Sequence, residues 1–192
     1  MTNLIGKNLT EVCQDHLLPE LDGNPNRPGL VNTPARFHKA WKELTRYRDL
    51  PARAFPELST TFEKEGMRDK DGEPIDDLVV ISGARIYSMC EHHLLPFFGV
   101  AHVGYISKNK VIGLSKIARL VDFFSRRLQV QERLTEQVAT ELQEIVESDA
   151  VGVVTQCRHM CMEMRGVSQP GIITTCSSIH GILRNAMAAR RI

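Results

Sequence analysis

The chain has 192 residues, of which 42% are hydrophobic and 24% charged, and its formal net charge is +1. This balance argues against a protein that binds nucleic acid through bulk positive charge, although a local basic site for a small anion stays possible. No segment approaches the roughly 18 consecutive apolar residues of a membrane span, and the N-terminus lacks the pattern of a secretion signal. We therefore expect a cytoplasmic protein with no nucleic-acid partner and no membrane segment.

Helical spacing dominates the first part of the chain. Residues 1–21 carry apolar side chains at helical intervals. Further on, Thr33 followed by Pro34 predicts the N-cap and first turn of another helix. Residues 48–57 have no clear periodicity and predict irregular structure. Together these features indicate an N-terminal helical arm over residues 1–57.

The middle of the chain favours strands. Residues 60–63, 78–81 and 97–106 are rich in β-branched and aromatic side chains, which suit a pleated, partly buried surface. The polar residues 69–74 contain Gly and Pro and predict a turn between two of these strands.

Two helices and two further strands complete the expected pattern. Ser115 can cap the first helix, and residues 131–147 carry the periodicity of the second. Residues 151–165 and 172–183 return to strand character. This order predicts an α+β domain over residues 58–192, with an antiparallel sheet and helices packed on one face.

Cysteine and histidine residues gather at two places about seventy residues apart. In a tight turn, Cys90 and His93 can reach one tetrahedral metal ion. If the strand predicted over residues 151–165 continues through Cys161, then Cys157, His159 and Cys161 alternate onto one face. Mixed thiolate and imidazole ligands suit zinc better than magnesium or calcium, so these two segments predict a shared zinc site. The alternative is a set of buried side chains without a metal.

Whether such a site is closed or open depends on Cys157. As a fourth protein ligand it would complete a structural site, whereas three protein ligands would leave a position for water. The spare imidazoles of His92 and His159 favour the open form, because each can exchange protons near neutral pH and a structural site has no need of them.

Residues 88–99, Ser-Met-Cys-Glu-His-His-Leu-Leu-Pro-Phe-Phe-Gly, resemble the zinc motif of the type I GTP cyclohydrolases. The likeness continues in order from about residue 9 to about residue 184. Four more stretches resemble the other signatures of that family: residues 29–36, 113–119, 129–135 and 159–166.

This resemblance implies a fold and a reaction. The family has the tunnelling fold, so residues 58–192 are expected to form a catalytic domain of that type. Its enzymes hydrolyse the imidazole ring of GTP, release formate and form 7,8-dihydroneopterin triphosphate, the first step of folate, biopterin or deazaguanine synthesis. They assemble as homodecamers with active sites at subunit contacts.

The resemblance also implies roles for individual residues. Cys90, His93 and Cys161 match the zinc ligands, and Cys157 matches a position that is not a ligand. His159 would protonate purine N7 while a zinc-activated water attacks C8. The catalytic set would also contain His92, near the ribose ring oxygen, Ser115, in the later sugar rearrangement, and Gln131.

The remaining implied residues bind the substrate. A carboxylate can accept hydrogen bonds from both the N1–H and the 2-amino group of guanine, and the resemblance gives this role to Glu132. Without the family match, Glu132 reads as an ordinary first-turn carboxylate. Four cations would hold the triphosphate, the last of them from another subunit: Lys116, Arg119, Arg165 and Arg36.

Two other functions compete with this interpretation. A nitrile reductase of deazaguanine metabolism would share the fold, but it needs a nucleophilic cysteine and a nicotinamide rather than two Cys/His segments. A closed structural zinc module or a GTP-binding regulator would have no turnover.

Overall fold

The computed structural model describes residues 6–63, 70, 77–107 and 110–182. The chain divides into two compact units, Met1–Arg46 and Tyr47–Ile192. The predicted polar turn lies outside the described residues except for Lys70, as do the first five residues of the first predicted helix.

The first unit is helical. A continuous helical segment consists of α1 (Leu9–Val12), a π-helical turn (Cys13–Leu17) and α2 (Leu18–Leu21). Its start is fixed by a capping box, in which the Asn8 side chain accepts from the backbone N–H of Glu11 and the Glu11 carboxylate accepts from that of Asn8.

The second helix of this unit is α3 (Thr33–Leu44). The predicted N-cap at Thr33 is wrong by one residue, because Asn32 occupies the cap position and Thr33 is the first helical residue. Pro34 lies in the first turn as predicted, where its missing N–H costs no hydrogen bond.

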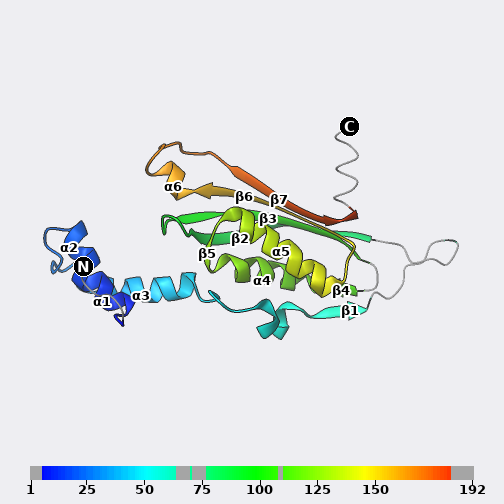
Figure 1. The fold of residues 1–192 in the computed structure, drawn as a ribbon, viewed down its shortest axis with the longest axis horizontal. Coiled ribbons are helices and arrows are strands. Elements are labelled where there is room, and N and C mark those ends of the chain that lie inside the picture. The colour runs from blue at the N-terminus through cyan, green and yellow to red at the C-terminus, as the bar shows by residue number, and fades with distance from the viewer. Residues whose placement is uncertain (1–5, 64–69, 71–76, 108–109, 183–192) are drawn as a thin grey trace. The chain divides into compact units, whose positions relative to one another are not determined.

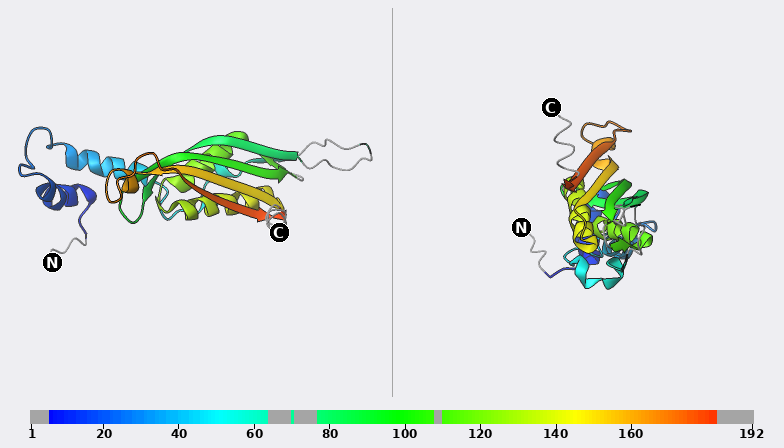
Figure 2. Two further views of the ribbon diagram at one scale, coloured as in Figure 1. Left: turned by 90° about the horizontal axis from the view of Figure 1, so that it is seen from above. Right: turned by 90° about the vertical axis from the view of Figure 1, so that its right-hand side faces the viewer.

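The second unit is built on a five-stranded sheet with the order β5-β2-β3-β6-β7. All neighbours are antiparallel except the short β5–β2 pair. Helices α4 and α5 cover one face of the sheet (Figures 1 and 2). The elements are β2 (Asp77–Cys90), β3 (Pro96–Ser107), α4 (Leu114–Ser125), β5 (Leu128–Gln129), α5 (Gln131–Val146), β6 (Ala150–His159) and β7 (Thr174–Gly181).

The alternation of β3 explains this layering. Phe97, Ala101, Val103 and Tyr105 are fully buried and point to the side of the helices, whereas the residues between them are partly exposed. The apolar stripes of α4 and α5 supply the rest of the core. The predicted α+β class, with an antiparallel sheet, helices on one face and N-terminal helices, is confirmed.

Three local predictions for the second unit are wrong. Strand β2 is much longer than residues 78–81, because a register shift beside Gly83 (φ 79°) lets it continue to Cys90. The strand predicted over residues 151–165 is too long, since β6 ends at His159 and the one-turn helix α6 (Met160–Glu163) follows. Gly113, not Ser115, is the N-cap of α4.

Residues 47–58 belong to the second compact unit, which begins at Tyr47 and so before the predicted domain boundary at residue 57. Its two 3₁₀ turns are Ala52–Ala54 and Pro56–Leu58. The rings of Tyr47 and Phe55 lie 4.7 and 5.2 Å from that of Phe123, which anchors this segment on α4. A two-stranded sheet of β1 (Thr61–Glu63) and β4 (Lys110–Ile112) follows.

None of the described helices combines the length and apolar character of a bilayer-spanning segment.

Candidate functional site

A tight turn at the end of β2 presents the first Cys/His pair. The Leu94 N–H donates to the Cys90 carbonyl at 2.8 Å, and the Cys90 N–H donates to the Leu95 carbonyl at 2.9 Å. Leu94 adopts a left-handed conformation with φ 53°, which reverses the chain. The turn brings His93 back over Cys90, with 3.6 Å between Cys90 Sγ and His93 Nδ1.

The second Cys/His segment, at the end of β6, lies beside this turn because of strand pairing. Phe97 at the start of β3 is the register partner of His159 at the end of β6. Helix α6 then turns Cys161 toward the first arm. As a result, the donor atoms of Cys90, His93 and Cys161 all lie within 4.8 Å of one another.

The chemistry of this group fits a zinc ion. Burial raises the pKa of the Cys161 thiol, and the neighbouring Cys90 raises it further. A divalent cation bound between two such neighbouring sulfurs would stabilise their thiolate forms. Two thiolates and an imidazole are ligands that zinc prefers over harder cations.

Cys157 has a different environment. It is buried, and burial together with Cys176 raises its pKa to about 12. It is not part of the three-residue donor group in the described part of the chain. The geometry therefore gives no support to the closed, four-ligand alternative.

The imidazole of His159 is held on two sides. Its ring stacks on Phe97, with centroids 4.8 Å apart and planes 9° apart. Its Nε2 lies 2.7 Å from Oε1 of Gln131, the first residue of α5. Burial lowers the pKa of His159, while the nearby charge of Glu132 opposes the shift. His92, by contrast, is exposed, and its ring lies 6.2 Å from that of His93.

A polar network beneath the metal turn was missed by the sequence analysis. Arg133 forms an ion pair with Glu91, which lowers the pKa of that carboxyl, and its Nε donates to Gln129 Oε1 at 2.9 Å. The Glu91 N–H donates to the Gln129 carbonyl at 3.0 Å. These contacts tie the turn to α5, and Arg133 lies in the stretch 129–135, one of those that resemble the family signatures.

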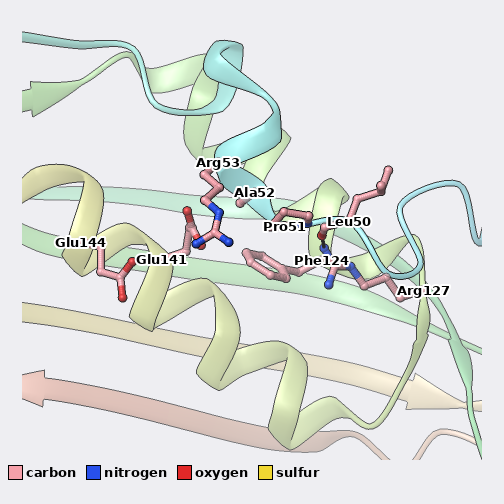
Figure 3. A pocket seen from close by; sticks show the side chains of 8 residues that line it. All are labelled: Leu50, Pro51, Ala52, Arg53, Phe124, Arg127, Glu141 and Glu144. Carbon is pink, nitrogen blue, oxygen red and sulfur yellow. Dashed lines mark hydrogen bonds between the residues drawn. The ribbon is translucent and has the colours of Figure 1, made fainter.

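Two cavities lie near this part of the second unit. One, of about 420 Å³, borders the Glu91–Arg133 pair. The other, of about 180 Å³, is lined by Arg53 and Arg127 and by Glu141 and Glu144 of α5, and the Arg53 guanidinium lies beside the Glu141 carboxylate (Figure 3). None of the predicted site residues lines either cavity, so neither is the predicted substrate site.

Only part of the predicted site is assembled within one chain. The first turn of α4 carries Ser115 and Lys116 and follows Ile112, whose N–H donates to the Tyr105 hydroxyl at 3.2 Å. Tyr105 pairs with Val79 at the start of β2, so this end of the sheet is roughly 35 Å from Cys90 at the strand spacing of 3.3 Å per residue (Figure 1).

The other predicted cations are placed differently. Arg119 lies one turn further along α4, whereas Arg165 follows α6 and its charge acts on Cys161. Arg36 is an exposed residue of α3 in the first unit. Glu132 is exposed in the first turn of α5, close enough for its charge to act on His159.

Comparison with known proteins identifies the family. The family model described as GTP cyclohydrolase I matches residues 10–192. "GTP cyclohydrolase 1" of Janthinobacterium sp. (strain Marseille) is 48% identical over 176 residues, covering 91% of this chain and 83% of that protein. "GTP cyclohydrolase 1" of Corynebacterium glutamicum (strain ATCC 13032) is 46% identical over 176 residues, covering 91% and 84%. Among solved structures, the archaeosine synthase QueF-Like in the apo form matches with a TM-score of 0.43 and 19% identity, over 54% of this chain and 93% of that one. This chain belongs to the GTP cyclohydrolase I family.

Proposed function

We propose that this protein is a zinc-dependent GTP cyclohydrolase I. It hydrolyses the imidazole ring of GTP, releases formate and forms 7,8-dihydroneopterin triphosphate. The observation that carries the proposal is the Cys90, His93 and Cys161 donor group, within 4.8 Å and beside His159, in a chain of this family. We expect the enzyme to act in the cytoplasm.

The three donors would hold Zn²⁺ and leave one position for solvent. When bound, zinc supplies Lewis-acid and water-activating chemistry at neutral pH. Cys90 and His93 would enter as a preformed pair, because the turn between them is fixed by its own backbone hydrogen bonds. Cys161 would close the set from the opposite arm.

His159 would act as the acid that protonates N7 of guanine and so makes C8 electrophilic. Its depressed pKa makes the protonated imidazole a stronger acid, and the stacked Phe97 ring holds its plane in place. His92 is exposed beside the same turn, where it can serve as a second acid or base toward the ribose.

Glu132 would recognise guanine. Its carboxylate is exposed in the first turn of α5, next to Gln131 and near His159, so one base can meet both side chains. Accepting hydrogen bonds from N1–H and the 2-amino group selects guanine over adenine, which offers no such pair of donors.

The remaining roles require more than one chain. Arg165 follows α6, the helical turn that carries Cys161, and would contact the triphosphate from this subunit. Because Ser115 and Lys116 lie at the far end of the sheet, they and Arg119 would reach the substrate of a neighbouring copy, and Arg36 would do so as well. The proposed enzyme is therefore a homo-oligomer, a decamer as in the rest of its family, with active sites at subunit contacts.

The test is incubation of the zinc-loaded protein with GTP. We expect stoichiometric formate and a dihydropterin triphosphate, detected by mass and ultraviolet absorption, and no turnover after the metal is removed. A metal-loaded protein that binds GTP without releasing formate would instead be a regulator or a structural module. Reduction of a nitrile with a nicotinamide would favour the other tunnelling-fold enzyme.

The shared site is tested by mixing two inactive variants, Lys116→Ala and His159→Asn. If each site takes α4 from one chain and the metal group from another, random mixed oligomers regain about a quarter of the sites. Homo-oligomers of either variant should stay inactive. No recovery in confirmed mixed oligomers would mean that one chain supplies both parts.

A further inference from the structure

The side-chain amide of Gln131 is surrounded by acceptors. Gln131 is only 1% exposed. Its Nε2 lies 3.0 Å from the Thr174 carbonyl on β7, 3.2 Å from the Thr155 carbonyl on β6 and 3.0 Å from the Thr155 hydroxyl. The amide therefore bridges two strands of the sheet from the first residue of α5.

These contacts fix which way the amide faces. A backbone carbonyl can only accept a hydrogen bond, so the NH₂ group must point toward Thr155 and Thr174. The flipped amide would bury its own oxygen against two carbonyl oxygens, with no proton between them. Such an arrangement is costly in a buried site, which leaves Oε1 directed at His159.

The hydroxyls around the amide agree with this orientation. Thr135 Oγ1 donates to the Gln131 carbonyl at 2.7 Å. It therefore accepts from the Thr155 hydroxyl, 2.7 Å away. Since the Thr155 proton is used in that bond, its oxygen is free to accept from the Gln131 amide. Each of the two hydroxyl protons then has one acceptor, and the two amide protons of Gln131 are surrounded by three acceptors.

We propose that Gln131 is a positioning residue that holds His159 with its proton on Nε2, so that Nδ1 is the nitrogen that exchanges a proton with the substrate. The 2.7 Å contact between His159 Nε2 and Gln131 Oε1 joins two atoms that repel each other unless Nε2 carries hydrogen. In neutral His159, Nδ1 is the lone-pair acceptor.

The stacked Phe97 ring keeps the two nitrogens from exchanging places. A half-turn of the imidazole would have to pass through an orientation perpendicular to the Phe97 ring, whose centroid is only 4.8 Å from its own. The role in proton transfer rests on the proposed cyclohydrolase function, whereas the tautomer is a property of this protein alone.

The tautomer is measured directly in the zinc-loaded oligomer. Protein labelled with ¹⁵N-histidine gives separate nitrogen signals for protonated and bare ring nitrogens, and the variant His159→Asn assigns those of His159. We expect His159 to carry hydrogen on Nε2 and none on Nδ1 at alkaline pH. Hydrogen on Nδ1 with bare Nε2 would overturn the proposal, whether or not the protein turns over GTP.

A matched pair of variants tests the effect on the reaction. Gln143 lies on the same helix and also presents its Oε1 to a histidine, 2.8 Å from His180 Nδ1, outside the proposed active site. We expect Gln131→Met to lower kcat by roughly tenfold or more, with KM for GTP changed less than about threefold and zinc retained. Gln143→Met should leave kcat unchanged.

The outcomes separate positioning from simple stabilisation. If Gln131→Met mixes the two His159 tautomers as kcat falls, the proposal is supported. If it lowers only the melting temperature and keeps both the tautomer and kcat, Gln131 is merely structural and the proposal is wrong. If Gln131→Met does not fold, the nitrogen signals of the unmodified protein still decide the tautomer.

Discussion

Gly99 lies on β3 opposite Cys157 of β6 in the register. A Cβ at this position would lie 1.9 Å from the Gln156 carbonyl oxygen and 2.8 Å from Cys157 Cα, both backbone atoms that no rotamer change can move. Relieving the clash needs the strands to separate by about 1.5 Å, which breaks the neighbouring N–H···O bonds. With about 1 kcal/mol for each lost bond, Gly99→Ala should lower the free energy of unfolding by about 3 kcal/mol or more.

The same change should weaken metal binding, because Phe97 and His159 form the second pair along this ladder from Gly99, and His159 is two residues before Cys161. The measurement is the urea midpoint together with zinc per chain, at equal protomer concentration. Gly104→Ala is the matched control on β3, since its Cβ would meet nothing closer than 3.7 Å. Equal midpoints and zinc contents for the two variants would refute the steric argument.

Three further predictions concern the site. Cys161→Ala should lose zinc and GTP turnover together, as measured by metal analysis and formate release; full turnover in the metal-free variant would contradict the assigned ligands. His159→Ala should keep zinc but slow ring opening by roughly a hundredfold or more, and unchanged single-turnover rates would show that another group donates the proton. The pKa of the Cys157 thiol is raised to about 12 from an ordinary value near 9, so the unfolded chain loses this proton first and the free energy of unfolding should fall as pH rises from about 9 through 12. Cys157→Ala should reduce that alkaline slope, and an identical slope in both proteins would show that the thiol is not buried.

The sequence predicted the parts of the fold that depend on local pattern. Helix α5 ends one residue before its predicted bound, and β3 differs from its prediction by one residue at each end. Strand β2 was underestimated because Gly83 and the polar residues after it interrupt the alternation, whereas pairing with β3 carries the strand through to Cys90. Tertiary pairing overrides local propensity there.

The metal donors were predictable for a reason that does not depend on the exact elements. Cys161 lies in a helical turn rather than a strand, yet its sulfur still lies close to that of Cys90. The residues directly after His159 lie at the same end of the sheet whether they form a strand or a helical turn. The supporting contacts were not predictable in this way. Thr174 meets Gln131 only because β7 pairs with β6, and no local pattern encodes that register.

The length of β2 determines how the proposed active site can be completed. This strand runs from the end of the sheet beside the first turn of α4 to the metal donors. A longer or shorter strand would therefore change the distance between the first turn of α4 and the metal donors. Helix α4 packs along β2 and cannot slide toward Cys90 without exposing Ile117, Leu120 and Val121, all fully buried. The core that stabilises each chain therefore also keeps Ser115 and Lys116 away from its own metal group. Under the proposed mechanism, turnover then depends on association of the chains and should be lost on dissociation even where each chain stays folded.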